Sequence, residues 1–175
     1  AGLTMVTVYQ EDLFLSFLPL SHTLERTAGY YLPIMSGSCV AFARSIGQLA
    51  EDLQAIRPTL LIAVPRIFER VYVRIQEQLA QAPWYRRGLF RLAVGVGWRR
   101  FEHRQGRAAW SPALLLWPLL RRLVTAKVLD KLGGRLRAAV SGGAALPFPV
   151  ARLFIALDVP ILQGYGLTET SPVLS

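Results

Sequence analysis

The sequence predicts an α/β fold in which a mostly parallel sheet is connected by crossover helices. Short apolar runs that suit buried strands alternate along the chain with stretches of helical spacing, and this alternation is typical of parallel sheets. The composition supports a folded domain, because 53% of the 175 residues are hydrophobic and 18% are charged. The run 59–64, TLLIAV, has no polar side chain after Thr59, which favours a strand covered on both faces.

Five segments are predicted strands, because each is a short apolar or alternating run that ends near proline, glycine or a polar cluster. They are residues 13–20, 38–43, 59–64, 136–140 and 159–165. Cys39, the only cysteine, lies in the second of these runs and is predicted to be packed. A single cysteine excludes an internal disulfide and a metal site built from several cysteines.

Helices are predicted between these strands. Ser45 is predicted to cap a helix over 46–56, which ends before Pro58. Pro147 is predicted to occupy the first position of a helix that runs to about Ala156. The other two predicted helices are 23–35 and a helix from Pro65 to about Gln81, in which Ile67, Val71, Ile75 and Leu79 form a buried stripe.

A basic helical insertion is predicted over about 84–132, between two strands of the sheet. Arginines fall near one helical face and apolar residues near another; the two sets are Arg87, Arg91 and Arg99, and Tyr85, Leu89, Leu92 and Val96. A second apolar and basic helix follows Pro112. We favour a surface hairpin that covers the core, and a peripheral membrane contact is the alternative. The apolar run 113–120 is far shorter than the ~20 residues that a membrane span requires.

The formal net charge is +9, and much of the excess lies between Arg86 and Arg137. Such a patch could attract nucleic acid, anionic lipid or an anionic small molecule, and a solvated arginine face is the alternative interpretation. No aromatic and basic RNA motif or zinc-finger spacing accompanies the charge, so nucleic acid is not the expected partner.

Three polar stretches follow predicted strands, namely PLSHTLER at 19–26, SGGAALP at 141–147 and GYGLTETSP at 164–172. In open parallel sheets, ligands bind beyond the carboxyl ends of the strands, so the three stretches are predicted to form one binding site. His22, in the first stretch, could orient a reacting group or neutralise developing charge. A structural histidine is the alternative.

The second and third stretches contain groups that suit a nucleotide. Gly142 and Gly143 can adopt positive φ and let the backbone approach a flat ligand. The ring of Tyr165 could lie against a base, and Thr168 offers a hydroxyl to a phosphate oxygen. Glu169 offers a hard carboxylate oxygen that suits Mg²⁺. An ordinary turn, with Thr168 as a cap and Glu169 in solvent, is equally compatible with these residues alone.

SGGAALP followed by GYGLTETSP resembles the paired motifs of the adenylate-forming enzymes. Within that superfamily, PLSHTLER and VPRIFERVY, at 64–72, resemble the long-chain fatty acyl-CoA synthetases. The resemblance covers most of the chain except 84–122. It implies that residues 1–175 form a partial AMP-binding domain, within the large N-terminal domain of such an enzyme.

The resemblance implies that the intact protein activates a fatty acid with ATP and Mg²⁺ to an acyl-adenylate, releases pyrophosphate, and transfers the acyl group to coenzyme A. The expected location is the cytoplasm, with peripheral contact at a membrane as an open alternative. Two other functions are left open: an adenylate-forming ligase for another carboxylate, including a fatty acyl-AMP ligase, and a non-catalytic basic protein that binds membrane or nucleic acid.

The resemblance also implies the adenine pocket. Gly143 and Ala144 would border the adenine. Gly164, Tyr165 and Gly166 would form the rest of this pocket, with Tyr165 stacking on the base.

By the same resemblance, His22, Thr168 and Glu169 are the expected catalytic residues. Thr168 would contact phosphate, Glu169 would bind Mg²⁺, and His22 would lie beside the reacting carboxylate. Catalysis would then consist of positioning and charge neutralisation while the carboxylate attacks the α-phosphate.

The sequence departs from the family pattern at Ala145, where many relatives have proline. The phosphate loop that ends in lysine is expected before Ala1. The ribose-binding aspartate and the C-terminal domain with its catalytic lysine are expected after Ser175. We therefore expect an internal piece of the N-terminal domain, inactive on its own because the β- and γ-phosphates would lack their lysine.

Overall fold

The computed structural model describes residues 7–164, which form two compact units. The sheet unit contains residues up to Pro65 together with 130–146 and 160–164. The helical unit contains residues 66–129 and 147–159.

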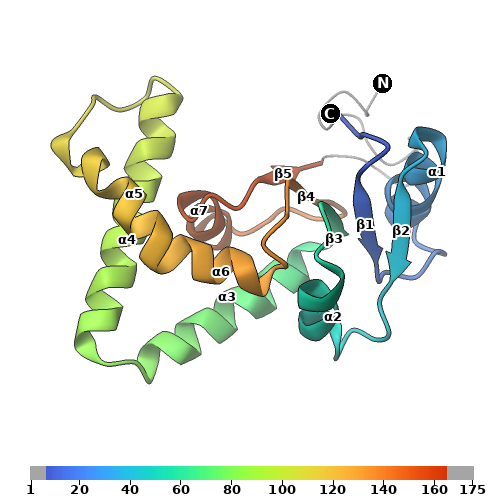
Figure 1. The fold of residues 1–175 in the computed structure, drawn as a ribbon, viewed down its shortest axis with the longest axis horizontal. Coiled ribbons are helices and arrows are strands. Elements are labelled where there is room, and N and C mark those ends of the chain that lie inside the picture. Colours follow the sequence, from blue (N-terminus) through green and yellow to red (C-terminus); the bar gives the residue numbers. More distant parts are fainter. Residues whose placement is uncertain (1–6, 165–175) are drawn as a thin grey trace. The chain divides into compact units, whose positions relative to one another are not determined.

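The sheet unit is built on five strands in the order β2-β1-β3-β4-β5, and every described strand pair is parallel (Figure 1). The strands are β1 (Leu13–Ser16), β2 (Cys39–Phe42), β3 (Leu60–Ala63), β4 (Ala138–Ser141) and β5 (Ile161–Gln163). The predicted α/β fold with a parallel sheet is confirmed. Because all strands run the same way, the segments that follow them leave from one edge of the sheet.

The centre of the sheet is apolar on both faces. All four residues of β3 are buried, as the run after Thr59 predicts. A core cluster surrounds this strand and consists of Phe14, Leu24, Ala28, Leu60, Ile62 and Ala138. Burying a leucine or phenylalanine of this kind stabilises the fold by about 1.5–3 kcal/mol.

The prediction that Cys39 is packed is wrong, because its side chain is exposed. Cys39 begins β2, which is an edge strand paired only with β1 among the described strands. Phe42, at the other end of β2, is 58% exposed for the same reason. An apolar run therefore marks a strand without showing that both of its faces are covered.

The helix predicted over 23–35 is present, but most of it is a π-helix, η2 (Glu25–Tyr31), followed by α1 (Leu32–Ser36). Pro33 has no backbone N–H and cannot complete an α-type hydrogen bond in this helix. π-Helical turns are rare in proteins, and those that occur are often found at functional sites. This one begins at Glu25, whose side chain is completely buried.

Helix α2 (Leu49–Ile56) begins later than predicted. Ser45 does not cap it: the Ser45 hydroxyl accepts a 3.2 Å hydrogen bond from the N–H of Gln48, within a turn that precedes the helix. Gly47 lies in this turn, and glycine disfavours helix because its unfolded chain has more conformational freedom. The helix ends before Pro58, as predicted.

The helical unit contains the helices predicted after Pro65, after Trp84, after Pro112 and near Pro147. They are α3 (Pro65–Ala80), α4 (Trp84–Arg104), η3 (Pro112–Leu116), α5 (Trp117–Leu120), η4 (Arg121–Thr125), α6 (Ala126–Lys131) and α7 (Phe148–Ala156), of which α3 begins and α6 ends in the sheet unit. A Cβ atom at Gly97 would collide with the carbonyl of Ala156, so glycine there permits close packing of α4 on α7.

Two predicted faces in this unit need correction. The stripe predicted as buried on α3 is only half-buried, and Phe68 is the core residue of that helix, with its ring edge-on to Phe154. On α4, Tyr85 and Leu92 are exposed, whereas Ala93, Val96 and Gly97 are buried. Small residues occupy this face because α7 lies against it. Among residues 7–164, no helix has the length and apolarity needed to cross a membrane.

Candidate functional site

The segments that follow β1, β4 and β5 lie at the same edge of the sheet unit. Gly164, directly after β5, donates its N–H to the carbonyl of Ser141, the last residue of β4, at 2.9 Å. A Cβ atom on Gly143 would have the Cε1 atom of His22 as its nearest neighbour, at 3.9 Å. The structure therefore brings together His22, Gly143 and Gly164, which come from three separate parts of the sequence.

The ring of His22 is held by its own turn. Its Nδ1 atom accepts a hydrogen bond from the N–H of Leu24 at 3.3 Å, and its backbone N–H donates to the carbonyl of Pro19 at 2.8 Å. Because Nδ1 accepts, the neutral ring carries its proton on Nε2. The side chain is exposed, so this Nε2–H is able to donate to a ligand at the edge of the sheet.

The two glycines after β4 have different roles. Gly142 is buried, and a Cβ atom there would lie 2.8 Å from a methyl group of Leu24, so its absence lets the two turns pack. Gly143 is exposed, has a φ of +84°, and has only the His22 ring near the place of a Cβ. Open backbone beside an Nε2–H fits a flat, polar ligand such as a nucleotide base or its sugar. Ala144, next in the chain, is also exposed.

Glu25, three residues after His22, is a functional residue that the sequence alone did not single out. Its carboxyl is completely buried, and its Oε1 atom accepts a 2.5 Å hydrogen bond from the hydroxyl of Ser16, at the end of β1. Burial raises the pKa of Glu25, and the Ser16 hydrogen bond opposes this only in part. A Cβ on Gly29 would lie 2.6 Å from Oε1, so the helix closes over the carboxyl. The sequence offers one signal: the small residues Ala28 and Gly29 follow Glu25 three and four positions later in the predicted helix, where they leave room for its side chain.

A second charged group ties the opposite ends of the strands together. Asp12, just before β1, accepts hydrogen bonds from the Thr59 hydroxyl at 2.7 Å, the Tyr9 N–H at 2.8 Å and the Arg137 guanidinium at 2.5 Å. Burial raises the pKa of Asp12, but the hydrogen bonds from Arg137, Tyr9 and Thr59 together bring it below its ordinary value. Thr59 and Arg137 precede β3 and β4, so this cluster is structural and lies away from the strand ends that carry the site.

Four of the expected site residues, Tyr165, Gly166, Thr168 and Glu169, lie outside the described residues. Within 7–164, no group of three or more histidine, cysteine, aspartate or glutamate side chains could hold a metal ion. The expected Mg²⁺ ligand is Glu169, so its assignment depends on the sequence alone.

Comparison with family models identifies the family of the chain. The model described as AMP-binding enzyme matches residues 2–175. The chain belongs to the AMP-binding enzyme family.

Curated relatives of the chain confirm the resemblance to long-chain acyl-CoA synthetases. Long chain acyl-CoA synthetase 1 of Arabidopsis thaliana is 34% identical, over a match that covers 91% of this chain and 24% of the relative. Fatty acyl-CoA synthetase A of Dictyostelium discoideum is 30% identical, over 97% of this chain and 24% of the relative. The chain thus spans about a quarter of the length of these relatives.

Two of the solved structures similar to the chain are A domains of carboxylic acid reductases. One is the A domain of a carboxylic acid reductase from Segniliparus rugosus, in complex with AMP and a co-purified carboxylic acid. It is 28% identical, has a TM-score of 0.58, and matches 93% of this chain and 21% of that one. The A domain of a carboxylate reductase from Mycobacterium chelonae, 23% identical with a TM-score of 0.64 over 96% of this chain and 22% of that one, shows the shared fold.

Proposed function

We propose that the chain is part of the adenylate-forming domain of a long-chain fatty acid–CoA ligase. In the first step, an oxygen of the fatty acid carboxylate attacks the α-phosphorus of ATP, and pyrophosphate leaves as the acyl-adenylate forms. In the second step, the sulfur of coenzyme A attacks the acyl carbon, and AMP leaves. The single observation that carries the proposal is the approach of His22 to Gly143 at the carboxyl edge of the sheet, in a chain similar to long-chain acyl-CoA synthetases.

The proposed roles follow from the side chains and backbone at this edge. Gly143 and Ala144 present open backbone to the adenine. His22 donates from Nε2 to the oxygens that carry negative charge as the carboxylate and the α-phosphate approach each other. The buried carboxyl of Glu25 supports the turn that carries His22, through its hydrogen bond to Ser16.

The remaining roles are assigned by sequence alone. Gly164, Tyr165 and Gly166 complete the adenine pocket, Thr168 binds phosphate, and Glu169 binds Mg²⁺. Mg²⁺ bound there would neutralise charge on the phosphates and on the departing pyrophosphate.

The test is product analysis with the full-length protein, ATP, Mg²⁺, coenzyme A and a series of carboxylic acids. We expect palmitate to yield palmitoyl-CoA, AMP and pyrophosphate, and acetate to yield much less product. Without coenzyme A, palmitoyl-adenylate should be detected by mass spectrometry. Formation of ADP, or equal use of acetate and palmitate, would contradict a long-chain acid ligase of this type.

We also propose that the helical unit contacts an anionic membrane through one surface, here called the 110–123 surface. Its large apolar side chains are between 40% and 71% exposed, and they are Trp110, Leu115, Leu116, Leu119 and Leu123. Arg107, Arg121 and Arg122, all exposed, flank them. Exposed leucine and tryptophan next to arginine is the composition of helices that lie in the membrane interface.

The membrane contact is tested by vesicle flotation of the full-length protein. Leu115→Gln combined with Leu119→Gln should reduce recovery with vesicles that contain phosphatidylserine. Met35→Gln is the matched control, because Met35 is 80% exposed but belongs to the sheet unit. If the double variant floats as well as the unchanged protein, the 110–123 surface is not the membrane contact.

A further inference from the structure

The helical unit contains a pocket of about 570 Å³ whose lining includes none of the residues assigned to the nucleotide. It is formed by α3, α4 and α7, all of which contribute side chains. Its volume falls within the ~300–1,000 Å³ that is usual for small-molecule sites.

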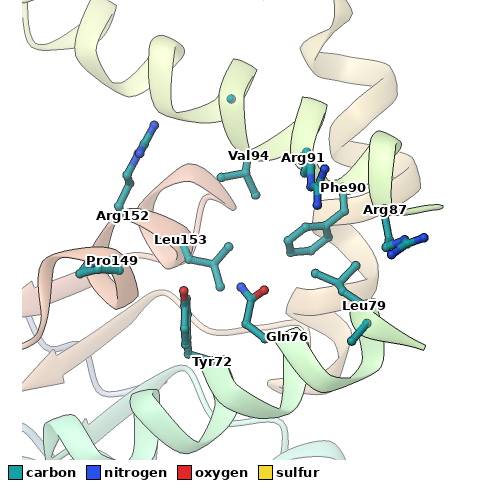
Figure 2. Close-up of a pocket in the computed structure, with 12 residues that line it drawn as sticks. Tyr72, Gln76, Leu79, Arg87, Phe90, Arg91, Val94, Pro149, Arg152 and Leu153 are labelled. Carbon is teal, nitrogen blue, oxygen red and sulfur yellow. The ribbon is translucent and has the colours of Figure 1, made fainter. Parts of the chain in front are cut away.

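The middle of the pocket is largely apolar. Figure 2 shows Phe90 and Val94 of α4 facing Leu79 of α3 and Leu153 of α7 across it. Phe90 and Val94 are four residues apart and so lie on the same face of their helix. These side chains are half-buried except for Leu153, which is buried, so they form a shallow apolar floor. Such a floor suits a hydrocarbon chain or a flat apolar group.

The rim of the pocket is positively charged. Arg87, Arg91 and Arg152 line it, and no aspartate or glutamate does. In Figure 2 the guanidinium groups of Arg87 and Arg152 point away from the middle, on opposite sides. Arg152 lies over the ring of Trp98, at 5.5 Å from its centroid. The charges are thus placed for a head group at the mouth of the pocket and not for one in its interior.

Two arginines of the helical unit already have an acidic partner, whereas Arg87 and Arg91 have none in the described part of the chain. Arg100 and Arg121 of the same unit are both paired with Asp158, at 2.8 and 3.7 Å. No ion pair involves Arg87 or Arg91 among residues 7–164. Like charges four residues apart on a helix repel each other and destabilise it. An anion bound beside the two arginines would remove that repulsion.

We propose that this pocket binds one long-chain carboxylate, with its hydrocarbon chain against Phe90, Val94 and Leu153 and its head group beside Arg87 and Arg91. The choice of a carboxylate among anionic head groups rests on the proposed function, in which the protein handles long-chain acids. Arginine binds carboxylates with two parallel hydrogen bonds, which suits this head group.

A nucleotide fits the pocket less well. Its base and sugar would need several hydrogen-bonding partners in the interior, where a polar group without a partner is costly. Figure 2 shows two polar groups directed toward the middle, the hydroxyl of Tyr72 and the amide of Gln76. The charges lie at the rim. An amphiphile with one charged end matches this division.

The pocket can be filled by a substitution that the fold tolerates. Gly95 lines the pocket, and a Cβ atom there would have no neighbour within 4 Å. Gly95→Leu should therefore occupy the space where the hydrocarbon chain lies, and it replaces a poor helix former with a good one. Gly88 of the same helix also has open space around a Cβ but does not line the pocket. Gly88→Leu is the matched control.

The experiment is photolabelling of the full-length protein with a diazirine analogue of palmitate, without ATP or coenzyme A, followed by mass spectrometry of peptides. We expect adducts within 72–80 of α3 and 87–95 of α4. Gly95→Leu should reduce them by about tenfold or more, and Arg87→Gln with Arg91→Gln should do the same. Gly88→Leu should leave them unchanged. Melting temperatures verify that each variant is folded.

Competition of the labelling by unlabelled amphiphiles tests how much the carboxylate head group contributes to binding. Palmitate should prevent the labelling at concentrations about tenfold lower than hexadecanol does, because hexadecanol lacks the charge. Equal competition by hexadecanol would overturn the role of the arginines, and stronger competition by hexadecyl phosphate would overturn the carboxylate. Absence of adducts from both segments, or labelling unaffected by Gly95→Leu, would overturn the site. Labelling requires no turnover, so its failure is distinguishable from failure of the proposed ligase activity.

Discussion

The buried carboxyl of Glu25 accepts a 2.5 Å hydrogen bond from the hydroxyl of Ser16. Ser16 ends β1, and Glu25 begins the π-helix that follows the turn of His22. The pair therefore fixes the path of the chain between a strand and the residue expected beside the reacting carboxylate. No cation is paired with Glu25 among residues 7–164, so the neutral acid is the form that burial favours.

We predict that Glu25→Gln makes the stability of the protein less dependent on pH. Burial raises the pKa of Glu25 above its ordinary value of 4.5, so stability from this group is present below that value and is lost as pH rises through the raised pKa. The amide of glutamine stays neutral. The melting temperature of Glu25→Gln relative to the unchanged protein should rise between about pH 4 and about pH 8.

Glu51→Gln is the control for this measurement, because Glu51 is exposed and pairs with Arg44 at the surface. A Glu25→Gln variant whose relative melting temperature stays constant over the same range would contradict a neutral buried acid.

Asp12→Asn should destabilise the sheet unit. Asp12 is 3% exposed and joins the segments before β1, β3 and β4 through Thr59 and Arg137. Loss of its charge should weaken these hydrogen bonds and cost about 1–3 kcal/mol of unfolding free energy at neutral pH. Urea unfolding of both proteins is the measurement.

The destabilisation caused by Asp12→Asn should depend on pH. The pKa of Asp12 is below its ordinary value of 3.8, so its contribution is present above that value and is lost as pH falls through the lowered pKa. The difference between Asp12→Asn and the unchanged protein should therefore shrink in acid. A difference that grows in acid would show that the Asp12 charge is not stabilising.

His22→Ala should lower the rate of acyl-adenylate formation by about 10²-fold or more, because a donor to the developing charge is lost. His22 is exposed, so the substitution leaves no cavity and the melting temperature should hardly change. His103→Ala is the matched control, since His103 is the other histidine of the chain and is exposed on α4. Equal activities of His22→Ala and His103→Ala would show that His22 is not part of the catalytic site.

Glu169→Gln should lower adenylation far more than it lowers folding stability. The side chain loses the charge that would bind Mg²⁺ while its size is kept, so the Mg²⁺ concentration for half-maximal rate should rise. Glu77→Gln, at an exposed position of α3, controls for the loss of one negative charge. An unchanged Mg²⁺ dependence in Glu169→Gln would assign the metal to other residues.

The strands and most helices could be predicted because apolar runs and helical spacing report local burial. Where the structure depends on which other residues or elements lie next to a segment, the sequence alone was insufficient to predict it. Cys39 lies in an apolar run yet is exposed, because β2 is an edge strand. Ser45 has the right side chain for a cap, but Gly47 delays the helix.

The candidate site was partly predictable for the same reason. Its polar stretches follow strands, so their shared edge could be predicted from the parallel sheet. The contacts that hold these stretches in place could not be predicted. The partner of Glu25 depends on how the π-helix returns to β1, and the Asp12–Arg137 pair joins residues 125 positions apart. Long-range pairs of this kind have no local signature.

The exchange of labelled pyrophosphate into ATP by the full-length protein tests the proposed activity most directly, because it reports acyl-adenylate formation without coenzyme A. We predict exchange that requires both palmitate and Mg²⁺ and that falls by about 10²-fold in His22→Ala. A folded protein that shows no palmitate-dependent exchange would contradict an adenylation site at the carboxyl edge of this sheet.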